Sequence, residues 1–276
     1  MNRAAPIDRA LTGASRIAGV LGWPVSHSRS PRLHGYWLRQ YAIDGAYIPL
    51  PVRPPDFMTA LRVLPHLGFV GANVTVPHKE AALAAVDRAQ PDVRRIGAVN
   101  TIIIAADGTL EGRNTDGFGF LESLRSSVTE WRASAGPAVI IGAGGAARAV
   151  AVALVDAGAP MVRIVNRTIE RAERLAGDIG GPMQVYGWDG RTKALVDAGL
   201  LVNTTILGMT SGPPLELDLA GLPTSAVVND IVYSPLETAL LCAARARGNR
   251  VVDGLGMLLH QARPGFAAWF GVEPEV

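Results

Sequence analysis

The chain has 276 residues, of which 49% are hydrophobic, so it is long enough for two domains with a substantial core. Its formal net charge is only +2 and its Lys and Arg residues are scattered, which argues against a nucleic-acid or membrane-surface partner. The one cysteine, Cys242, excludes an internal disulfide. Because it lies among alanines and leucines, we expect it to be a buried, inert thiol.

Residues 1–15 lack the apolar centre of a secretory signal, so we expect an unstructured leader there. The best candidate for a membrane span is interrupted by Arg148, and no other apolar run is long enough to cross a bilayer. We therefore expect a cytoplasmic protein with no membrane partner.

A strand is predicted over residues 17–22, and a helix over residues 32–41. Ser30 precedes Pro31, which is typical of a helix N-cap with proline in the first turn. Ser28 remains as a small hydroxyl donor at a strand-to-helix junction, where open α/β sheets tend to bind ligands. Capping and ligand binding are nearly equal interpretations of this segment alone.

A second strand over residues 46–52 and a helix after Pro55 continue the alternation. Residues 73–76 are predicted as a strand, after which Lys79 begins the next helix. Helix N-termini favour anions, so a lysine there breaks a local rule and is a candidate functional residue. His78 is expected to form a capping or structural hydrogen bond. The five histidines show no ligand spacing, so no metal site is expected.

Residues 96–104 predict another strand, and Asp107-Gly108 predicts the turn of a hairpin that returns through residues 110–112. A loop then leads into a helix near Asp116. Helix capping alone would justify an acid there. However, the chain also crosses to its second domain at this point, which makes Asp116 a candidate at an interdomain cleft.

An apolar run at residues 138–141 precedes the glycine loop, Gly142-Ala143-Gly144-Gly145-Ala146, and a helical pattern follows through Leu154. This order is typical of a dinucleotide site. The first glycine permits the turn, the second lets backbone N–H groups approach a pyrophosphate, and the helix N-terminus supplies unpaired donors. The alternative is a tight turn in an ordinary α/β domain.

A second strand at residues 161–165 ends at Asn166-Arg167-Thr168, with Arg171 one helical turn further on. An NAD site usually has Asp or Glu there, which accepts hydrogen bonds from the ribose 2′-OH. A guanidinium favours a 2′-phosphate instead, so the predicted cofactor is NADP. The alternative is that both arginines are solvated charges on a helix face.

Taken together, these motifs resemble the shikimate dehydrogenase family, including its quinate and aminoshikimate relatives. The matching blocks follow the family order over nearly the whole chain after Arg16: Ser26-His27-Ser28-Arg29-Ser30-Pro31, Asn73-Val74-Thr75-Val76-Pro77-His78-Lys79, Gly97-Ala98-Val99-Asn100-Thr101, Asn114-Thr115-Asp116-Gly117, the glycine loop, Asn166-Arg167-Thr168, and Gly254-Leu255-Gly256-Met257-Leu258-Leu259-His260-Gln261-Ala262.

The resemblance implies reversible, NADP-dependent reduction of the small molecule 3-dehydroshikimate to shikimate, a step of aromatic amino-acid biosynthesis. It implies that Lys79 and Asp116 are the catalytic pair, and the sequence leaves open which of them moves the proton. The substrate-binding residues it implies are Ser28 and Ser30 for the carboxylate, Thr75, Asn100 and Gln261 for hydroxyl groups, and Tyr233 lining the site.

The glycine loop, Asn166, Arg167, Thr168 and Arg171 correspond to cofactor-binding positions, and Met209 and Gly254 match positions beside the nicotinamide. The turn at residues 203–209 departs from the family, which more often has alanine and serine there. The details of the nicotinamide contact at Met209 therefore stay open.

The implied fold class is α/β with two domains. Residues 1–115 and 255–276 are expected to form an open α/β substrate domain, and residues 116–254 a doubly wound Rossmann NADP-binding domain. The protein is expected to be a monomer or homodimer. A quinate- or aminoshikimate-preferring enzyme is the alternative within the family. A catalytically silent NADP-binding sensor is the alternative outside it, but a sensor would have no need of both Lys79 and Asp116.

Overall fold

The structure, a computed structural model, describes residues 11–210 and 212–276, so most of the expected leader lies outside the described residues. The chain forms two compact units. The first unit contains the chain up to Arg94 together with Ala98–Thr115 and Ala262–Val276. The second unit contains Arg95–Gly97 and Asp116–Gln261. The chain therefore leaves the first unit and returns to it, as a discontinuous domain does.

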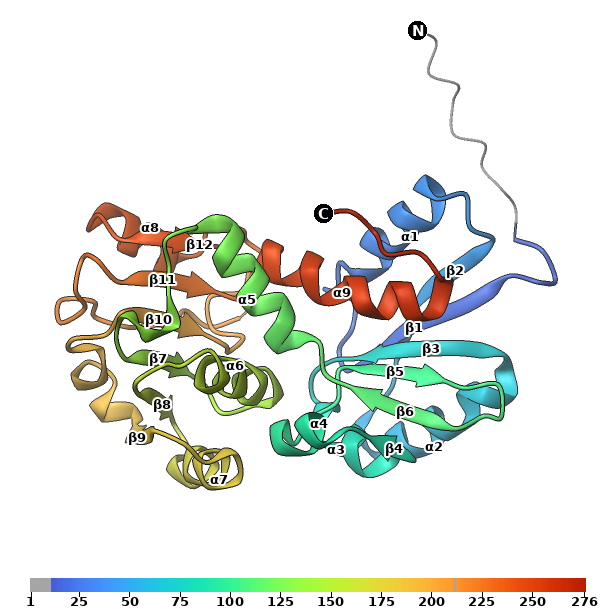
Figure 1. Cartoon of the computed structure of the whole chain (residues 1–276), viewed down its shortest axis with the longest axis horizontal. Coiled ribbons are helices and arrows are strands. Elements are labelled where there is room, and N and C mark those ends of the chain that lie inside the picture. The colour runs from blue at the N-terminus through green and yellow to red at the C-terminus, as the bar shows by residue number, and fades with distance from the viewer. Residues whose placement is uncertain (1–10, 211) are drawn as a thin grey trace, which may run out of the picture. The chain divides into compact units, whose positions relative to one another are not determined.

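The first unit is built on a six-stranded mixed sheet with the strand order β2-β1-β3-β5-β6-β4 (Figure 1). Its strands are β1 (Arg16–Gly22), β2 (Gly45–Pro51), β3 (Phe69–Val74), β4 (Arg88–Ala89), β5 (Thr101–Ile104) and β6 (Leu110–Arg113). Strand β1 runs parallel to β2 and β3, whereas β5 runs antiparallel to both β3 and β6. The β5–β6 hairpin confirms the predicted turn at Asp107-Gly108, where the Asp107 carboxylate accepts a hydrogen bond from the Thr109 N–H at 2.9 Å.

The helices in this part of the chain are α1 (Ser30–Gln40), α2 (Phe57–Val63), α3 (Lys79–Ala85) and α4 (Pro91–Ile96). Helix α3 begins at Lys79, as predicted. Two strand predictions were wrong in extent. Strand β3 ends at Val74, two residues before the predicted end, because the His78 N–H bonds to the Thr75 carbonyl and turns the chain. The segment predicted as one strand from residue 96 is the end of α4 followed by β5.

The second unit contains a six-stranded sheet, all parallel, with the order β12-β11-β10-β7-β8-β9. Its strands are β7 (Ala138–Ile141), β8 (Val162–Asn166), β9 (Met183–Gly187), β10 (Leu200–Asn203), β11 (Val227–Asp230) and β12 (Arg250–Val252). Numbered from β7, this is the 3-2-1-4-5-6 order of the doubly wound dinucleotide fold, which confirms the predicted class. The strand order reverses between β7 and β10, which is where such folds bind ligands.

The helices that follow the chain through the second unit are α5 (Asp116–Ser127), α6 (Gly145–Asp156), α7 (Ile169–Ile179) and α8 (Ala239–Ala246), and α9 (Gly254–Phe270) runs from the second unit into the first. Fully buried Val139, Ile141, Leu201 and Val228 belong to one core cluster of this unit. Cys242 on α8 is exposed, so the prediction of a buried thiol was wrong. The helix face that packs inward at this point presents Leu241 and Ala244 instead.

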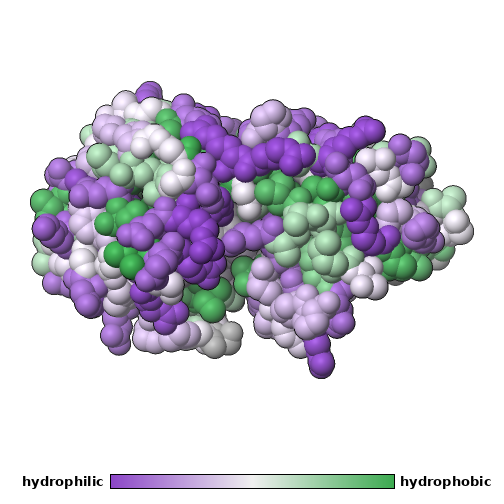
Figure 2. Space-filling model, turned by 90° about the horizontal axis from the view of Figure 1, so that it is seen from below, coloured by the Kyte–Doolittle hydropathy of each residue, from purple (hydrophilic) through white to green (hydrophobic). Residues whose placement is uncertain are grey.

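Exposed apolar side chains are distributed over both units, and the face in Figure 2 alternates between hydrophobic and hydrophilic patches. Among the described residues, no helix is both long enough and apolar enough to span a membrane.

An aromatic cluster in the first unit surrounds the buried side chain of His34. The imidazole is stacked on the Tyr47 ring with centroids 4.0 Å apart, and Trp37 and Phe266 also lie against it. Both ring nitrogens are buried without a hydrogen-bond partner. Burial among these rings lowers the pKa of His34 from 6.5 to about 3, because the charged form would lose its hydration.

The neutral His34 makes stability depend on pH. Between pH 6.5 and about 3 the unfolded chain binds a proton at His34 that the folded chain excludes. The contribution of the neutral His34 to the unfolding free energy is therefore complete above pH 6.5 and is lost as the pH falls towards about 3. The parent should therefore lose up to about 1.4 kcal/mol more unfolding free energy per pH unit than His34→Phe does within this window. Urea denaturation at a series of pH values measures the difference. The exposed His66 offers the control, because His66→Gln should follow the parent; parallel curves for the parent and His34→Phe would refute the assignment.

Candidate functional site

The predicted substrate-binding residues of the first unit lie next to the ends of neighbouring strands, after β1, after β3 and before β5. Strands β1 and β3 are parallel, so their carboxyl ends lie at one edge of the sheet, and the antiparallel β5 begins at that same edge. The Thr75 N–H bonds to the Leu21 carbonyl at 2.9 Å, and the Val74 N–H bonds to the Asn100 carbonyl at 2.8 Å. The sheet order thus brings the segments after β1, after β3 and before β5 to one edge.

Ser28 and Ser30 occupy the segment after β1. The helix begins at Ser30 and its N-cap is Arg29, so the prediction of Ser30 as the N-cap was wrong. Instead, the Ser28 hydroxyl accepts a hydrogen bond from the Ser30 N–H at 3.3 Å. The physical reason is that Arg29 already has helical dihedral angles, which moves the start of the helix. Capping therefore does not account for the buried Ser30 hydroxyl.

The segment after β3 carries Thr75, His78 and Lys79. The His78 ring stacks on Phe57 with centroids 4.4 Å apart, and its Nε2 lies 2.8 Å from the Val52 carbonyl. This confirms the structural hydrogen bond expected of His78. The carbonyl of Lys79 accepts a hydrogen bond from the Val99 N–H at 2.8 Å, which ties the start of α3 to the segment before β5. The side chains of Thr75 and Lys79 are partly exposed.

Asn100 holds the end of the chain segment that leads to Asp116. Its Oδ1 accepts a hydrogen bond from the Thr115 N–H at 2.9 Å, and its Nδ2 donates to Thr115 Oγ1 at 3.0 Å. The residue after Thr115 is Asp116, which is 4% exposed and begins α5. A buried amide thus fixes the backbone immediately before one of the two predicted catalytic residues. Thr115 was not singled out from the sequence.

In the second unit, Gln261 on α9 lies against α5. A Cβ added at Gly119, one helical turn after Asp116, would lie 2.7 Å from the Gln261 backbone nitrogen. The Gln261 side chain donates to the Leu258 carbonyl at 3.1 Å. Gly119 therefore allows a close approach of the two helices that carry Asp116 and Gln261.

The glycine loop lies at the point where the strand order of the second sheet reverses. Gly142 has φ +112°, a conformation that favours glycine. Thr204, after β10, bonds to the Ile141 carbonyl through both its N–H, at 2.9 Å, and its hydroxyl, at 2.7 Å. A Cβ added at Gly144 would meet no heavy atom within 4 Å. Gly144 thus leaves an open space at the N-terminus of α6, as a pyrophosphate site requires.

Arg167 and Thr168 are exposed at the end of β8, and Arg171 is exposed in the first turn of α7. The Asn166 side chain donates to the Thr168 carbonyl at 2.8 Å and so fixes the turn between the strand and the helix. Among the residues that the structure describes, none forms an ion pair with Arg167. These positions fit a phosphate that approaches from solvent.

A buried pair, Asn203 and Asp230, organises the turn at residues 203–209 that contains Met209. Asn203 donates to Asp230 Oδ1 at 2.9 Å and to the Leu207 carbonyl at 3.0 Å. Asp230 also accepts from the Thr238 hydroxyl at 2.7 Å. Burial raises the pKa of Asp230, and these hydrogen bonds to its carboxylate oppose the shift.

Tyr233 and Gly254 follow the ends of β11 and β12. The Thr210 N–H bonds to the Ser234 carbonyl at 3.0 Å, which joins the turn at 203–209 to the Tyr233 segment. A Cβ at Gly254 would lie 2.3 Å from the Ile231 carbonyl oxygen, so only glycine permits this close approach. The loops after β10, β11 and β12 are thus joined at the carboxyl edge of the second sheet.

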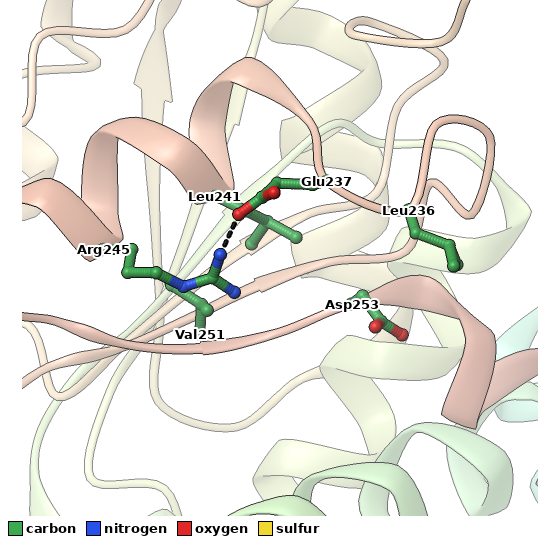
Figure 3. A pocket seen from close by; sticks show the side chains of 6 residues that line it. All are labelled: Leu236, Glu237, Leu241, Arg245, Val251 and Asp253. Carbon is green, nitrogen blue, oxygen red and sulfur yellow. Dashed lines mark hydrogen bonds and ion pairs between the residues drawn. The ribbon is translucent and has the colours of Figure 1, made fainter.

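A small hollow of about 150 Å³ lies between α8 and β12 (Figure 3). Its lining residues are Leu236, Glu237, Leu241, Arg245, Val251 and Asp253. Glu237 and Arg245 form an ion pair across it. None of the six is a site residue predicted from the sequence, so this hollow is not part of the predicted site.

Alanine substitutions at Gly142 and Gly144 should have different effects on stability and on NADP binding. Gly142→Ala forces a strained φ and a clash 2.7 Å from Thr204 Oγ1, so it should lower the unfolding free energy by roughly 1–3 kcal/mol. Gly144→Ala has room, so its unfolding free energy should stay within about 0.5 kcal/mol of the parent. It should nevertheless weaken NADP binding, because the added methyl occupies the space of the pyrophosphate. Urea denaturation and NADPH fluorescence titration measure the two effects, and unchanged NADPH affinity of Gly144→Ala would contradict this role of the loop.

Sequence reasoning missed Thr115, Asn203 and Asp230. Their signal is a polar residue at the end of an apolar strand or at a loop-to-helix junction, which suggests a buried group that needs hydrogen-bond partners. The partners themselves are set by strand register, which the sequence does not state.

Two families of known proteins match separate parts of the chain. Residues 20–102 match the family described as "Shikimate dehydrogenase substrate binding domain", and residues 125–206 match "Shikimate / quinate 5-dehydrogenase". A relative from Paramagnetospirillum magneticum, named shikimate dehydrogenase (NADP(+)), is 62% identical over 96% of this chain and 96% of its own length.

Solved structures of shikimate and quinate dehydrogenases are also similar to this chain. Shikimate 5-dehydrogenase from Thermus thermophilus, in complex with NADP(H) and shikimate, is 38% identical, with a TM-score of 0.83 over 94% of this chain and 95% of that one. Quinate dehydrogenase from Corynebacterium glutamicum, in complex with NAD, is 32% identical, with a TM-score of 0.86 over 95% of each chain.

Proposed function

The chain belongs to the shikimate dehydrogenase family, and on this premise we propose that it catalyses the reversible, NADP-dependent interconversion of 3-dehydroshikimate and shikimate. The observation that carries the proposal is the 62% identity to a NADP-dependent shikimate dehydrogenase along 96% of both chains. The reaction is a step of aromatic amino-acid biosynthesis. A cytoplasmic location and a monomeric or homodimeric state belong to the same proposal.

Residues 116–254, which lie in the second unit, are proposed as the NADP-binding domain. The glycine loop, with open space at Gly144, receives the pyrophosphate. Arg167, Thr168 and Arg171, all exposed at the end of β8, receive the 2′-phosphate, while Asn166 holds their turn. Met209 and Gly254 lie beside the nicotinamide. When bound, NADPH supplies a hydride and NADP⁺ accepts one.

Residues 1–115 and 255–276 are proposed as the substrate domain, of which residues 95–97 and 255–261 belong to the second compact unit. Ser28 and Ser30 donate hydrogen bonds to the substrate carboxylate. Thr75, Asn100 and Gln261 bind ring hydroxyl groups, and Tyr233 lines the site. Support comes from the hydrogen bonds that join the segments after β1 and β3 and before β5 at one edge of the first sheet.

Lys79 and Asp116 are proposed to transfer the proton to and from the substrate oxygen. Reduction of a ketone requires a proton at the carbonyl oxygen as hydride arrives at its carbon, and oxidation of the alcohol requires the reverse. A lysine and a carboxylate can share this task as one coupled pair. The Asn100–Thr115 hydrogen bonds support this role, because they fix the backbone next to Asp116.

A preference for quinate is the second candidate, since one structural neighbour is a quinate dehydrogenase. That neighbour is described in complex with NAD, whereas the end of β8 in this chain carries Arg167 rather than an acid. Shikimate with NADP is therefore the better-supported pair.

Removing either member of the proton-transfer pair tests the mechanism. Lys79→Ala or Asp116→Asn should lower turnover of shikimate by roughly 10²–10⁴-fold, because general acid–base catalysis contributes about that much. NADPH binding, measured by fluorescence titration, should change little. Turnover close to that of the parent in Lys79→Ala would exclude the lysine from the chemistry.

Replacing Arg167 tests the cofactor choice. Arg167→Ala loses a charge-assisted hydrogen bond to the 2′-phosphate, so the NADP Michaelis constant should rise by roughly 10–100-fold. The NAD constant should hardly move, because NAD has no phosphate at that position. Arg174→Ala, another exposed arginine of α7, makes the same change in charge and should leave both constants near those of the parent. Equal weakening of NADP and NAD by Arg167→Ala would make Arg167 a general surface charge.

A further inference from the structure

Helix α5, which begins at Asp116, is packed between two other helices of the second unit and meets both of them through glycines. A Cβ added at Gly117 would lie 3.0 Å from the Ala149 carbonyl oxygen of α6. A Cβ added at Gly119 would lie 2.7 Å from the Gln261 backbone nitrogen of α9. Each residue of a helix is rotated by about 100° from the one before, so Gly117 and Gly119 face nearly opposite sides. The backbone of α5 is thus the spacer between α6 and α9.

The contact between α5 and α9 leaves no room for a side chain at Gly119. The three heavy atoms nearest to an added Cβ are the Cβ, the backbone nitrogen and the Cα of Gln261, at 2.6, 2.7 and 2.9 Å. A side-chain rotation moves none of these atoms, so a methyl group at position 119 would displace the backbone of α9 at Gln261. Further along the same helix pair, a Cβ at Gly256 of α9 would lie 3.1 Å from the Cβ of the buried Ser123. The two helices are therefore close at a second point as well.

Helix α5 cannot relieve such a clash by moving away from α9, because α6 lies behind it. At Gly117 the space is already filled by the Ala149 carbonyl and by the Ala153 Cβ, which would lie 3.1 Å from an added Cβ. Ala149 is itself buried, and a close-packed interior does not yield easily. The absence of a side chain at Gly119 therefore determines how near Gln261 comes to α5, the helix that Asp116 begins.

We propose that Gly119 is a positioning residue that sets the distance between Gln261 and Asp116, so that the Gln261 side chain reaches a ring hydroxyl of shikimate while Asp116 serves the reacting oxygen. This inference rests on the proposed function, which assigns both of these residues. Gly119 has no side chain with which to touch the substrate, and its effect passes through the backbone of α9. A small misplacement of a binding group is enough to lose its contact. Shikimate binding should therefore depend on Gly119, and NADP binding should not.

Gly119→Ala tests the proposal in steady-state kinetics. The added methyl group displaces Gln261, so the Michaelis constant for shikimate should rise about 3–10-fold, the contribution of one hydrogen bond. The NADP constant and kcat should stay near those of the parent. Gly177→Ala is the matched control, because Gly177 also lies within a helix, α7, but a Cβ there would meet no heavy atom within 4 Å. This control should leave every constant unchanged.

A double-mutant cycle with Gln261→Ala separates positioning from a general loss of stability. Alanine keeps the backbone nitrogen, Cα and Cβ of Gln261, so the clash with Gly119→Ala and any loss of stability remain in the double variant. The side chain that reaches the substrate is gone, however. Adding Gly119→Ala to Gln261→Ala should therefore not raise the shikimate Michaelis constant further. Effects that multiply, or a parental constant in folded Gly119→Ala, would overturn the proposal.

Gly117→Ala supplies a milder second variant, which keeps the proposal testable if Gly119→Ala does not fold. Its methyl group pushes α5 away from α6 and against α9, so the shikimate Michaelis constant should rise, by less than in Gly119→Ala, and only where Gln261 is present. A rise that is equal in the parent and Gln261→Ala backgrounds would contradict the proposal. Failure of the parent protein to oxidise shikimate would instead overturn the proposed function, so the two failures are distinct.

Discussion

In both units, a buried asparagine amide at the edge of a sheet holds the chain segment that carries proposed site residues. Asn100 holds Thr115, next to Asp116, and Asn203 holds the turn that contains Met209. A primary amide has two donors and one acceptor oxygen, so one buried side chain can fix several backbone groups at once. Leaving any of these groups unpaired would cost about 1–3 kcal/mol, which makes the loop conformation hard to change.

In this arrangement, buried groups and exposed groups have different tasks. The amides and their partners are buried and set the geometry, whereas Arg167 and Thr168 are exposed and supply charge and donors. Salt screens contacts with exposed charges but hardly affects buried hydrogen bonds. The proposed NADP phosphate contact should accordingly be sensitive to ionic strength, and the buried hydrogen bonds of Asn100 and Asn203 should not.

The sequence predicted best those parts of the fold whose local pattern decides the structure. The strand, glycine turn and helix around Gly142 were recognised because each residue agrees with its neighbours, and the Asp107-Gly108 hairpin was recognised from its turn chemistry. Details that depend on tertiary contacts were missed or wrong. Ser30 begins a helix rather than capping it, and Cys242 faces outward although its neighbours Leu241 and Ala244 are buried.

The roles of the substrate-binding residues came from resemblance to a family, whereas those of the glycine loop and Arg167 came from the motif itself. The register that sets Asn73 opposite Thr101, and the side-chain hydrogen bond between Tyr47 and Asn73, join residues far apart in the chain. Single-sequence reasoning has no access to such pairs, because the hydrophobic pattern fixes which face of a strand is buried but not which partner it meets.

Steady-state kinetics of the parent protein test the central claim most directly, with shikimate and quinate each assayed against NADP and NAD. We predict the highest kcat/KM for shikimate with NADP, and a preference for NADP over NAD of about 10–100-fold, the contribution of one charge-assisted hydrogen bond to the 2′-phosphate. A higher kcat/KM for quinate with NAD, or no turnover of shikimate with either cofactor, would contradict this claim.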